Sequence, residues 1–157
     1  MALLKIEFGR PKHGWMDVAV AAGENHFTVY ASYMPRDSVG DLASAAALIL
    51  KGGVEATVVW FEEPNEVDFH FTAEGDEAML VVTRYPDDRR TKQARNELLR
   101  VRGTRADVSL PFWRGLRKLQ SIVPPNEYKA AWKNRFPVEK LDEIAALVQQ
   151  GHGKAGQ

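Results

Sequence analysis

The sequence predicts an α+β fold, in which a mostly antiparallel sheet of six or seven strands is covered by helices. Apolar and polar residues alternate through much of residues 1–105, and this period of two is typical of half-buried strands. From Asp107 onward the apolar residues recur at helical spacing instead. Because the strands come first and the helices last, we expect three C-terminal helices packed on one antiparallel sheet rather than alternating βαβ units.

Three strands are expected at the start of the chain, at about residues 4–8, 16–20 and 27–33. In each of them apolar side chains occupy every second position and therefore share one face. The intervening segments "GRPKHG" and "AGEN" are rich in Gly, Pro and Asn, which are typical of turns. The first third of the chain is therefore predicted to form a meander.

A helix is expected next, from about Ser38 to Lys51. Ser38 and Asp41 have the spacing of a capping box, in which a hydroxyl and a carboxylate satisfy unpaired backbone donors of the first turn. Gly52 and Gly53 can adopt the left-handed conformation that ends a helix. The many alanines of this segment indicate close packing against the sheet.

A second meander is expected after this helix, with strands at about residues 54–62, 66–73 and 77–85. A further strand is predicted at about residues 97–102, although the segment "RRTKQARNELLR" is also compatible with a helix on propensity. The two meanders therefore flank the single helix.

Three C-terminal helices complete the predicted fold, separated by Pro124, Pro125 and Pro137. We expect residues 1–150 to form a single domain and residues 151–157 a disordered tail, because "GHGKAGQ" has no apolar side chain to bury beyond one alanine. The apolar stripes consist of Phe112, Leu116, Leu119 and Val123 in the first helix, Tyr128, Ala131 and Trp132 in the second, and Val138, Leu141, Ala145 and Val148 in the third.

Length and composition indicate a cytoplasmic protein of one domain. The chain has 157 residues, of which 45% are hydrophobic, enough for one sizeable core. It has no cysteine, which excludes disulfides and thiolate metal sites. The start of the sequence does not have the pattern of a secretory leader, and no apolar run approaches the roughly 18 residues that cross a bilayer. We therefore expect no membrane association.

Charge is distributed unevenly along a chain whose net charge is zero. Residues 1–83 contain 13 acidic and 5 basic side chains, whereas residues 84–118 contain 11 basic and 4 acidic ones. Such asymmetry can steer a charged partner, and it is also compatible with a homo-oligomer. It can equally be neutralised within the fold where the two regions pack together.

The acidic character is concentrated in "WFEEPNEVDFHFTAEGDE", residues 60–77, which contains seven carboxylates and no lysine or arginine. If Val67, Phe69 and Phe71 face the core, the acids face water and form a surface suited to a basic partner. The predicted partner-binding residues are Glu62, Glu63, Glu66, Asp68, His70, Glu74, Asp76 and Glu77.

Asp68 and His70 suggest a second interpretation, since two positions on one strand place both side chains about 7 Å apart on one face. Such a pair could support acid–base chemistry in a hydrolase, or line the pocket of a small-ligand-binding protein. The simpler interpretation is the solvated face of a strand. No histidine has metal-ligand spacing and no common nucleophile or phosphate-binding motif is present, so we expect no catalytic residue, metal or cofactor.

Residues 84–105 form a basic segment that could follow a phosphate backbone, which makes nucleic-acid binding a further alternative. The segment has no interleaved aromatics of the kind that stack on single-stranded bases, so it is more simply a charged hairpin and edge strand. The four tryptophans, Trp15, Trp60, Trp113 and Trp132, are most simply core residues, and the alternative is that Trp15 or Trp132, which lie beside polar turns, is an exposed partner anchor.

Residues 25–85 combine a strand pair, one helix, an acidic strand ending at Glu63 and Pro64, and a hairpin with a glycine turn. This layout resembles that of small bacterial immunity proteins of contact-dependent and wall-associated toxin systems. The resemblance implies a non-catalytic protein that neutralises a toxin by binding it. An acidic surface suits a basic toxin such as a nuclease, because complementary charge accelerates association. We therefore expect a protein-binding module.

Overall fold

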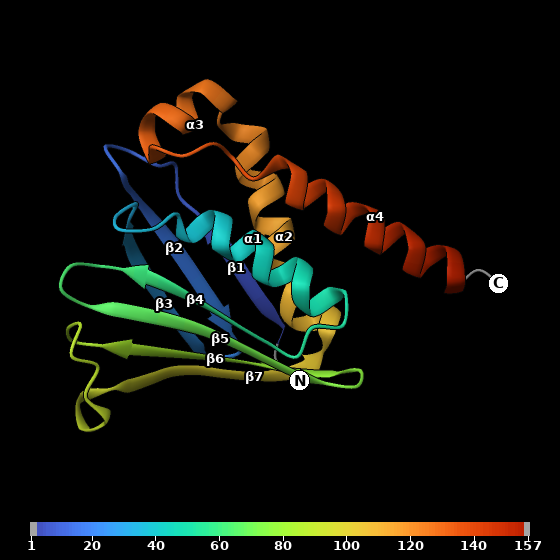
Figure 1. The fold of residues 1–157 in the computed structure, drawn as a ribbon, viewed down its shortest axis with the longest axis horizontal. Helices are drawn as coiled ribbons and strands as arrows, with labels where there is room; N and C mark the ends of the chain where they lie inside the picture. Colours follow the sequence, from blue (N-terminus) through green and yellow to red (C-terminus); the bar gives the residue numbers. More distant parts are fainter. Residues whose placement is uncertain (1–2, 156–157) are drawn as a thin grey trace.

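The computed structural model describes the backbone of residues 3–155 and the side chains of residues 3–151. Its seven antiparallel strands and four helices within this range confirm the α+β class (Figure 1). The strands are β1 (Leu4–Phe8), β2 (Trp15–Ala22), β3 (Asn25–Ser32), β4 (Glu55–Phe61), β5 (Glu66–Glu74), β6 (Glu77–Tyr85) and β7 (Asn96–Thr104). The helices are α1 (Ser38–Leu50), α2 (Arg105–Ile122), α3 (Pro125–Trp132) and α4 (Val138–Ala155), with a short 3-10 turn, η1 (Lys92–Ala94).

The strands follow one another in space in the same order as in the chain. β1–β3 and β4–β7 form two well-paired meanders, but β3 and β4 are joined through the single residue pair Ser32 and Phe61. Beyond this pair the meanders diverge, and Figure 1 shows the blue strands crossing behind the green ones. The sheet therefore has two parts with one narrow junction, and α1 connects them along the chain.

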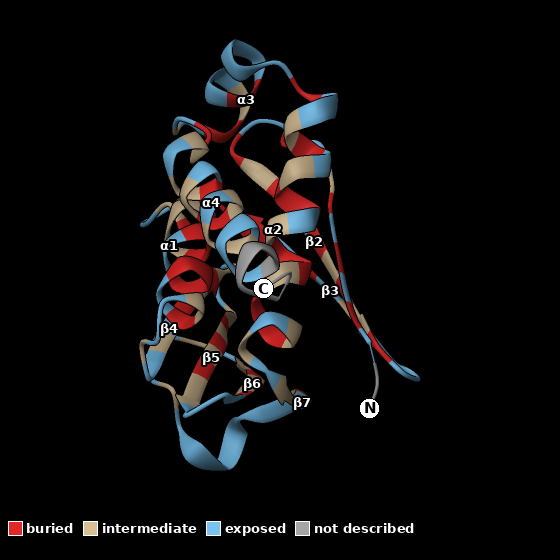
Figure 2. Cartoon of the chain, turned by 90° about the vertical axis from the view of Figure 1, so that its right-hand side faces the viewer, coloured by how far each residue is buried: buried red, intermediate tan, exposed pale blue. Residues whose placement is uncertain are grey.

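The core lies between the sheet and the helices. Strand alternation buries Phe69 and Phe71 of β5 on the inner face, where both rings contact Phe112 of α2 at centroid distances of 5.8 and 5.5 Å. α2 begins with a capping box in which Thr104 and Asp107 bond each other's backbone N–H groups. Figure 2 shows the buried residues concentrated where these elements face one another.

The helices form two layers rather than one. α1 packs on β4, and α2 packs on β1, β6 and β7, so the curled sheet surrounds much of α2. α4 packs on α1 and α2, and α3 contacts β2 at one end of the molecule (Figures 1 and 2). None of the described helices combines the length and the apolar composition that crossing a bilayer requires.

The start of α1 differs from the predicted capping box. The N-cap is Asp37, whose Oδ1 accepts a hydrogen bond from the Gly40 N–H at 3.1 Å. Ser38 is fully buried, and its hydroxyl donates to the Val59 carbonyl of β4 at 2.5 Å. Asp41 instead bonds the exposed Arg36 at 2.9 Å. The prediction was wrong because the hydroxyl joins α1 to the sheet, a contact that helix spacing does not reveal.

The structure also gives the secondary structure of the ambiguous basic segment and of the C-terminus. Residues 96–104 form strand β7, which confirms the strand rather than the helix in the ambiguous basic segment. At the C-terminus, residues 151–155 continue α4, where the sequence predicts a tail, and residues 156 and 157 lie outside the described residues.

Candidate functional site

The predicted acidic residues lie along β5 and at both ends of the β5–β6 pair. Val67, Phe69 and Phe71 are fully buried on the inner face. Asp68 and His70 lie on the opposite face, as strand alternation predicts. The environments of the acids differ greatly, however, so the eight predicted residues do not form one uniform surface.

Glu62 is part of the sheet junction rather than of a free surface. Its carboxylate accepts two hydrogen bonds from Arg84, at 2.9 and 3.1 Å, and one from the Tyr30 N–H at 3.0 Å. Arg84 also donates to the Thr28 carbonyl at 3.3 Å. The Glu62 side chain is only 11% exposed. These contacts explain its position in the fold without any partner.

Glu66 and Asp68 are likewise bound within the fold. Arg90, in the β6–β7 connection, donates to Glu66 at 2.5 Å and to Asp68, and its guanidinium lies 4.2 Å from the Tyr85 ring centroid. Partial burial lowers the pKa of Arg90, but the hydrogen bonds to Asp68 and Glu66 outweigh it, so the net shift is upward. The expectation of free carboxylates does not hold for Glu62, Glu66 and Asp68, because arginines 22 to 24 positions further along the chain bind them, one from β6 and one from the β6–β7 connection.

Asp68 and His70 do not face each other as an acid–base pair. Asp68 binds Arg90, whereas the His70 Nε2 lies 3.6 Å from the Glu55 carboxylate on β4. Neither residue lines any of five surface hollows found within residues 3–151. Within the same residues, no group of three or more acidic or histidine side chains is arranged to hold a metal ion. The geometry therefore gives the hydrolase and ligand-pocket alternatives no support.

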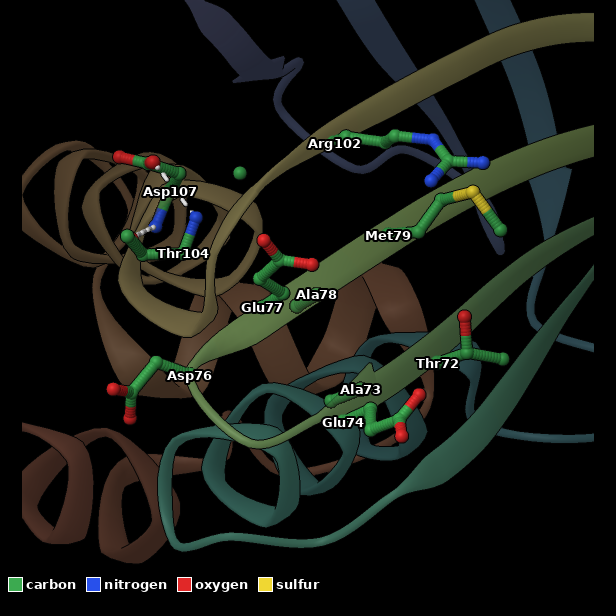
Figure 3. A pocket seen from close by; sticks show the side chains of 11 residues that line it. Thr72, Ala73, Glu74, Asp76, Glu77, Ala78, Met79, Arg102, Thr104 and Asp107 are labelled. Atoms are coloured by element: carbon green, nitrogen blue, oxygen red, sulfur yellow. Dashed lines mark hydrogen bonds between the residues drawn. The ribbon is translucent and has the colours of Figure 1, made fainter.

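Three of the predicted acids remain free at the hairpin that joins β5 and β6. Glu74 and Glu77 are paired across the two strands, and Asp76 lies in the turn between them (Figure 3). All three side chains are exposed, and none forms an ion pair within the part of the chain that the structure describes. Like charges directly opposite each other destabilise a strand pair. The hairpin thus maintains an unfavourable concentration of negative charge.

These acids border a hollow of about 780 Å³, which we call the distal hollow. Its wall also contains Met79 and Arg102, neighbours on β6 and β7, and Asp107, whose carboxylate is bonded to Thr104 (Figure 3). Four carboxylates against one guanidinium give this wall a net charge of −3. Such a surface favours a cationic partner.

A second hollow, of about 480 Å³, lies at the other end of β5 and is called the proximal hollow here. Met34, Pro35, Phe61 and Pro64 provide apolar walls, and Met34 is 49% exposed. The polar lining residues are Glu63, Asn65, Glu66, Asp87 and Asp88, of which Glu66 and Asp87 are paired with Arg90 and Arg89. Within residues 3–151, Glu63 is therefore the predicted residue that forms no ion pair at this end, beside the unpredicted Asp88.

The basic segment is largely used within the fold. Besides Arg84 and Arg90, Arg100 binds Glu97 at 2.6 Å, and Arg105 donates to three backbone carbonyls at 2.6–2.8 Å. Arg89 binds Asp87 at 2.7 Å. Because so many of its guanidiniums are bound, residues 84–105 present few free cations for a phosphate backbone.

The two candidate tryptophan anchors differ. Trp132 is fully buried, and its indole N–H donates to Asp37 at 2.9 Å, which agrees with the simpler interpretation of a core residue and rules out the alternative of an exposed anchor. Trp15 is partly exposed and stacks on Tyr30 with ring centroids 4.8 Å apart. The adjacent basic turn was missed, although "RPKHGW" shows three basic side chains beside an aromatic one.

Comparison with known proteins found no family model that matches the sequence, and no curated protein or solved structure that matches it.

Proposed function

We propose that this protein is a non-catalytic protein-binding module that captures a basic protein partner through the distal hollow. The observation that carries the proposal is the set of three exposed carboxylates, Glu74, Asp76 and Glu77, that lack a basic partner in the described structure. Elsewhere on the same strand pair, Arg90 neutralises the acids Glu66 and Asp68 of β5. Charge left unpaired at one end, at a cost in stability, is what a receptor for a cationic surface requires.

The shape of the hollow supports a protein rather than a small cation. Met79 and the methyl group of Thr72 provide apolar contact between the charged groups, and the hollow is open and about 780 Å³ in volume. Protein interfaces commonly combine such an apolar centre with a charged rim. The carboxylates would accelerate association, and the apolar contacts would slow dissociation.

The proximal hollow supplies a second contact for the same partner. The nine residues of β5 separate the two hollows by about 26 Å at 3.3 Å per residue. An interface of standard size covers about 800 Å² on each partner, which is about 30 Å across. One partner can therefore reach both hollows, inserting a cationic side chain with an apolar stem between Phe61, Glu63 and Asp88.

In its more specific form, the proposal is that the partner is a basic toxin, which the protein neutralises as an immunity protein would. This form rests on the resemblance of residues 25–85 to toxin-immunity proteins and on the acidic character of the exposed hairpin. Bound at the distal hollow, the protein would cover the cationic surface with which a nuclease approaches its substrate.

The test is co-purification from a lysate of the source cell, with the tagged full-length chain as bait. We expect a basic protein to be retained by the wild type and lost when Glu74→Gln, Asp76→Asn and Glu77→Gln are combined. A control triple variant, Glu7→Gln, Glu24→Gln and Glu139→Gln, changes the net charge by the same amount at exposed sites on other elements. Equal retention of the basic protein by both triple variants would reject the distal hollow as its site.

The proposal that the partner is a toxin is tested by a separate measurement. The gene for the captured protein should arrest growth when expressed alone, and co-expression of the wild type should restore growth. The distal triple variant should fail to do so while melting at the temperature of the control variant. If the captured protein is harmless to the cell, the proposal of a protein-binding module stands, but the proposal that it neutralises a toxin is rejected.

A further inference from the structure

The turn between β1 and β2 forms a second candidate binding site, far from the acidic hairpin in sequence and opposite to it in charge. The turn is fixed to the helices by Gly14, whose N–H donates to the Ala131 carbonyl at 2.7 Å, and by Arg10, which binds Glu127 at 2.7 Å and the Ile122 carbonyl at 3.2 Å. Between turn and helix α3 remains a hollow of about 530 Å³. The turn and helix α3, which border the hollow, are therefore held together by a backbone hydrogen bond and an ion pair.

The lining of this hollow is apolar at its floor and positive at its rim. Pro11, Ala130 and Ala131 provide apolar contact. Lys12 and Lys133 contribute two ammonium groups that have no carboxylate partner within residues 3–151. The one acid of the lining, Glu127, is already bound by Arg10, and the Ala131 carbonyl is occupied by Gly14. The groups that remain available thus favour an anion.

An aromatic surface adjoins the same turn. Arg10, Lys12 and His13 also line a smaller hollow of about 180 Å³, whose other walls include Trp15 and Tyr30. The two rings are stacked at 4.8 Å with an interplanar angle of 16°, and Tyr30 is 53% exposed. Aromatic rings exposed beside cations are the combination with which proteins bind bases and phosphates together.

A hydrogen-bond acceptor completes the arrangement. Asp17 is paired with Tyr30 across β2 and β3 and lines only the smaller hollow, whereas Lys133 lines only the larger one. The Asp17 carboxylate therefore lies on the side of the turn that carries the aromatic rings, and the Lys133 ammonium lies on the other side. This order suits a ligand with a ring and hydroxyl or amino groups at one end and an anion at the other.

We propose that the β1–β2 turn binds a nucleoside phosphate, with the base stacked on Tyr30 and the phosphate held by Lys12 and Lys133. The same chemistry is offered by a free mononucleotide and by one nucleotide of a single strand. Arg10 is a positioning residue in this proposal, since its bond to Glu127 fixes the turn against α3.

The test is calorimetric titration of the full-length chain with AMP, adenosine, inorganic phosphate and a short single-stranded oligothymidylate. We expect saturable binding of AMP that is tighter than that of adenosine or phosphate alone. Combining Lys12→Gln with Lys133→Gln should weaken AMP binding about tenfold, as should Tyr30→Ala. The control pair Lys5→Gln and Lys92→Gln, exposed elsewhere, removes the same charge and should leave AMP binding unchanged.

The four ligands separate the possible outcomes. An oligothymidylate bound more tightly than AMP, and lost in the Lys12 and Lys133 variant, would support the site with a single strand as its source. Phosphate bound as tightly as AMP would overturn the proposal, since the rings would then contribute nothing. The proposal is also overturned if neither AMP, at about 10 mM, nor the oligothymidylate binds, or if the Lys12 and Lys133 variant matches its control.

Discussion

Glu62 and Arg84 together replace the backbone hydrogen bonds that the sheet lacks where β3 separates from β4. Beyond the pair of Ser32 and Phe61 the two strands are no longer paired. There the Glu62 carboxylate accepts the Tyr30 N–H, and Arg84 donates to the Thr28 carbonyl. Because the two side chains also bind each other, one ion pair satisfies a donor and an acceptor of β3.

Replacing either member of this ion pair should destabilise the protein markedly. Glu62→Ala leaves the Tyr30 N–H without its acceptor and Arg84 without its carboxylate partner, with only the Thr28 carbonyl still bonded, and Arg84→Ala leaves a carboxylate that is 11% exposed without its cation. We expect each to lower the free energy of unfolding by about 2–4 kcal/mol, and the double variant to lose less than the sum. Urea denaturation of the four proteins measures this directly.

Glu97→Ala is the matched control. It breaks the pair of Glu97 and Arg100, in which both side chains are nearly half exposed. Such a pair contributes at most about 1 kcal/mol. If Glu62→Ala costs no more than Glu97→Ala, then Glu62 does not hold the junction together.

The sequence was sufficient for the strands and their faces because this information is local. Alternation of apolar residues in β5 predicts that Phe69 and Phe71 are buried, and the structure agrees. The glycine turn at Gly75 likewise predicts the β5–β6 hairpin, and Gly75 has a φ of +59°. Neighbours within a few residues determine both features, so no knowledge of the tertiary fold is needed.

The ion pairs and buried polar groups could not be predicted in this way. Arg90 binds Asp68 from 22 positions along the chain, and the indole N–H of Trp132 binds Asp37 from 95 positions away. A run of acids looks the same in sequence whether or not arginines return to it. The sequence therefore indicated where the acids are but not which of them stay free, and it is this difference that selects Glu74, Asp76 and Glu77.

Gly115 and Gly151 should respond to alanine in opposite directions. In a helix, alanine is favoured over glycine by about 1 kcal/mol. A Cβ at Gly115 in α2, however, would lie 3.0 Å from both the Ile6 carbonyl oxygen and the Phe8 ring of β1, whereas a Cβ at Gly151 in α4 would meet nothing within 4 Å. We expect Gly115→Ala to destabilise by about 1–3 kcal/mol and Gly151→Ala to be neutral or stabilising. Thermal melting of both variants checks the signs, and a stabilising Gly115→Ala would show that α2 can move away from β1.

Glu143 should couple the docking of α4 to pH. Its carboxylate is bound by Lys51, at the end of α1, at 2.6 Å and by Lys140 at 3.2 Å, and these hydrogen bonds hold the pKa of Glu143 below its ordinary value. A carboxylate whose pKa is lower in the folded state than in the unfolded state contributes stability at pH values above its unfolded pKa. This contribution is lost as the pH falls through the folded pKa.

Combining Lys51→Met with Lys140→Met should therefore raise the pKa of Glu143 towards its ordinary range. Carboxyl-carbon NMR titration measures this shift. The variant should be less stable than the wild type at neutral pH, and the difference should shrink as the pH falls below the ordinary glutamate pKa of about 4.3 and vanish below the lower folded-state pKa of Glu143. A difference that persists in acid would mean that the lysines act through packing rather than through the carboxylate.

Tyr128→Phe should not destabilise the protein at neutral pH. The Tyr128 ring is 1% exposed and packs edge-on against Phe136 at 5.0 Å, a contact that phenylalanine retains. The hydroxyl is buried and has no hydrogen-bond partner among the described residues. Removing an unsatisfied polar group is neutral or stabilising by up to about 1 kcal/mol. Denaturation at pH 7 tests this, and a loss above about 1 kcal/mol would mean that the hydroxyl is bonded.

The same substitution should alter the response to alkali. Burial, and to a smaller extent the nearby Asp37 carboxylate, raises the pKa of Tyr128 above its ordinary value. Because only the unfolded state ionises readily, the wild type should lose about 1.4 kcal/mol per pH unit from this group above about pH 10. Tyr128→Phe should lack this loss, whereas the control Tyr30→Phe, at an exposed ring, should retain it. If the free energy of unfolding of Tyr128→Phe and of Tyr30→Phe falls equally with pH above about pH 10, the Tyr128 hydroxyl reaches solvent.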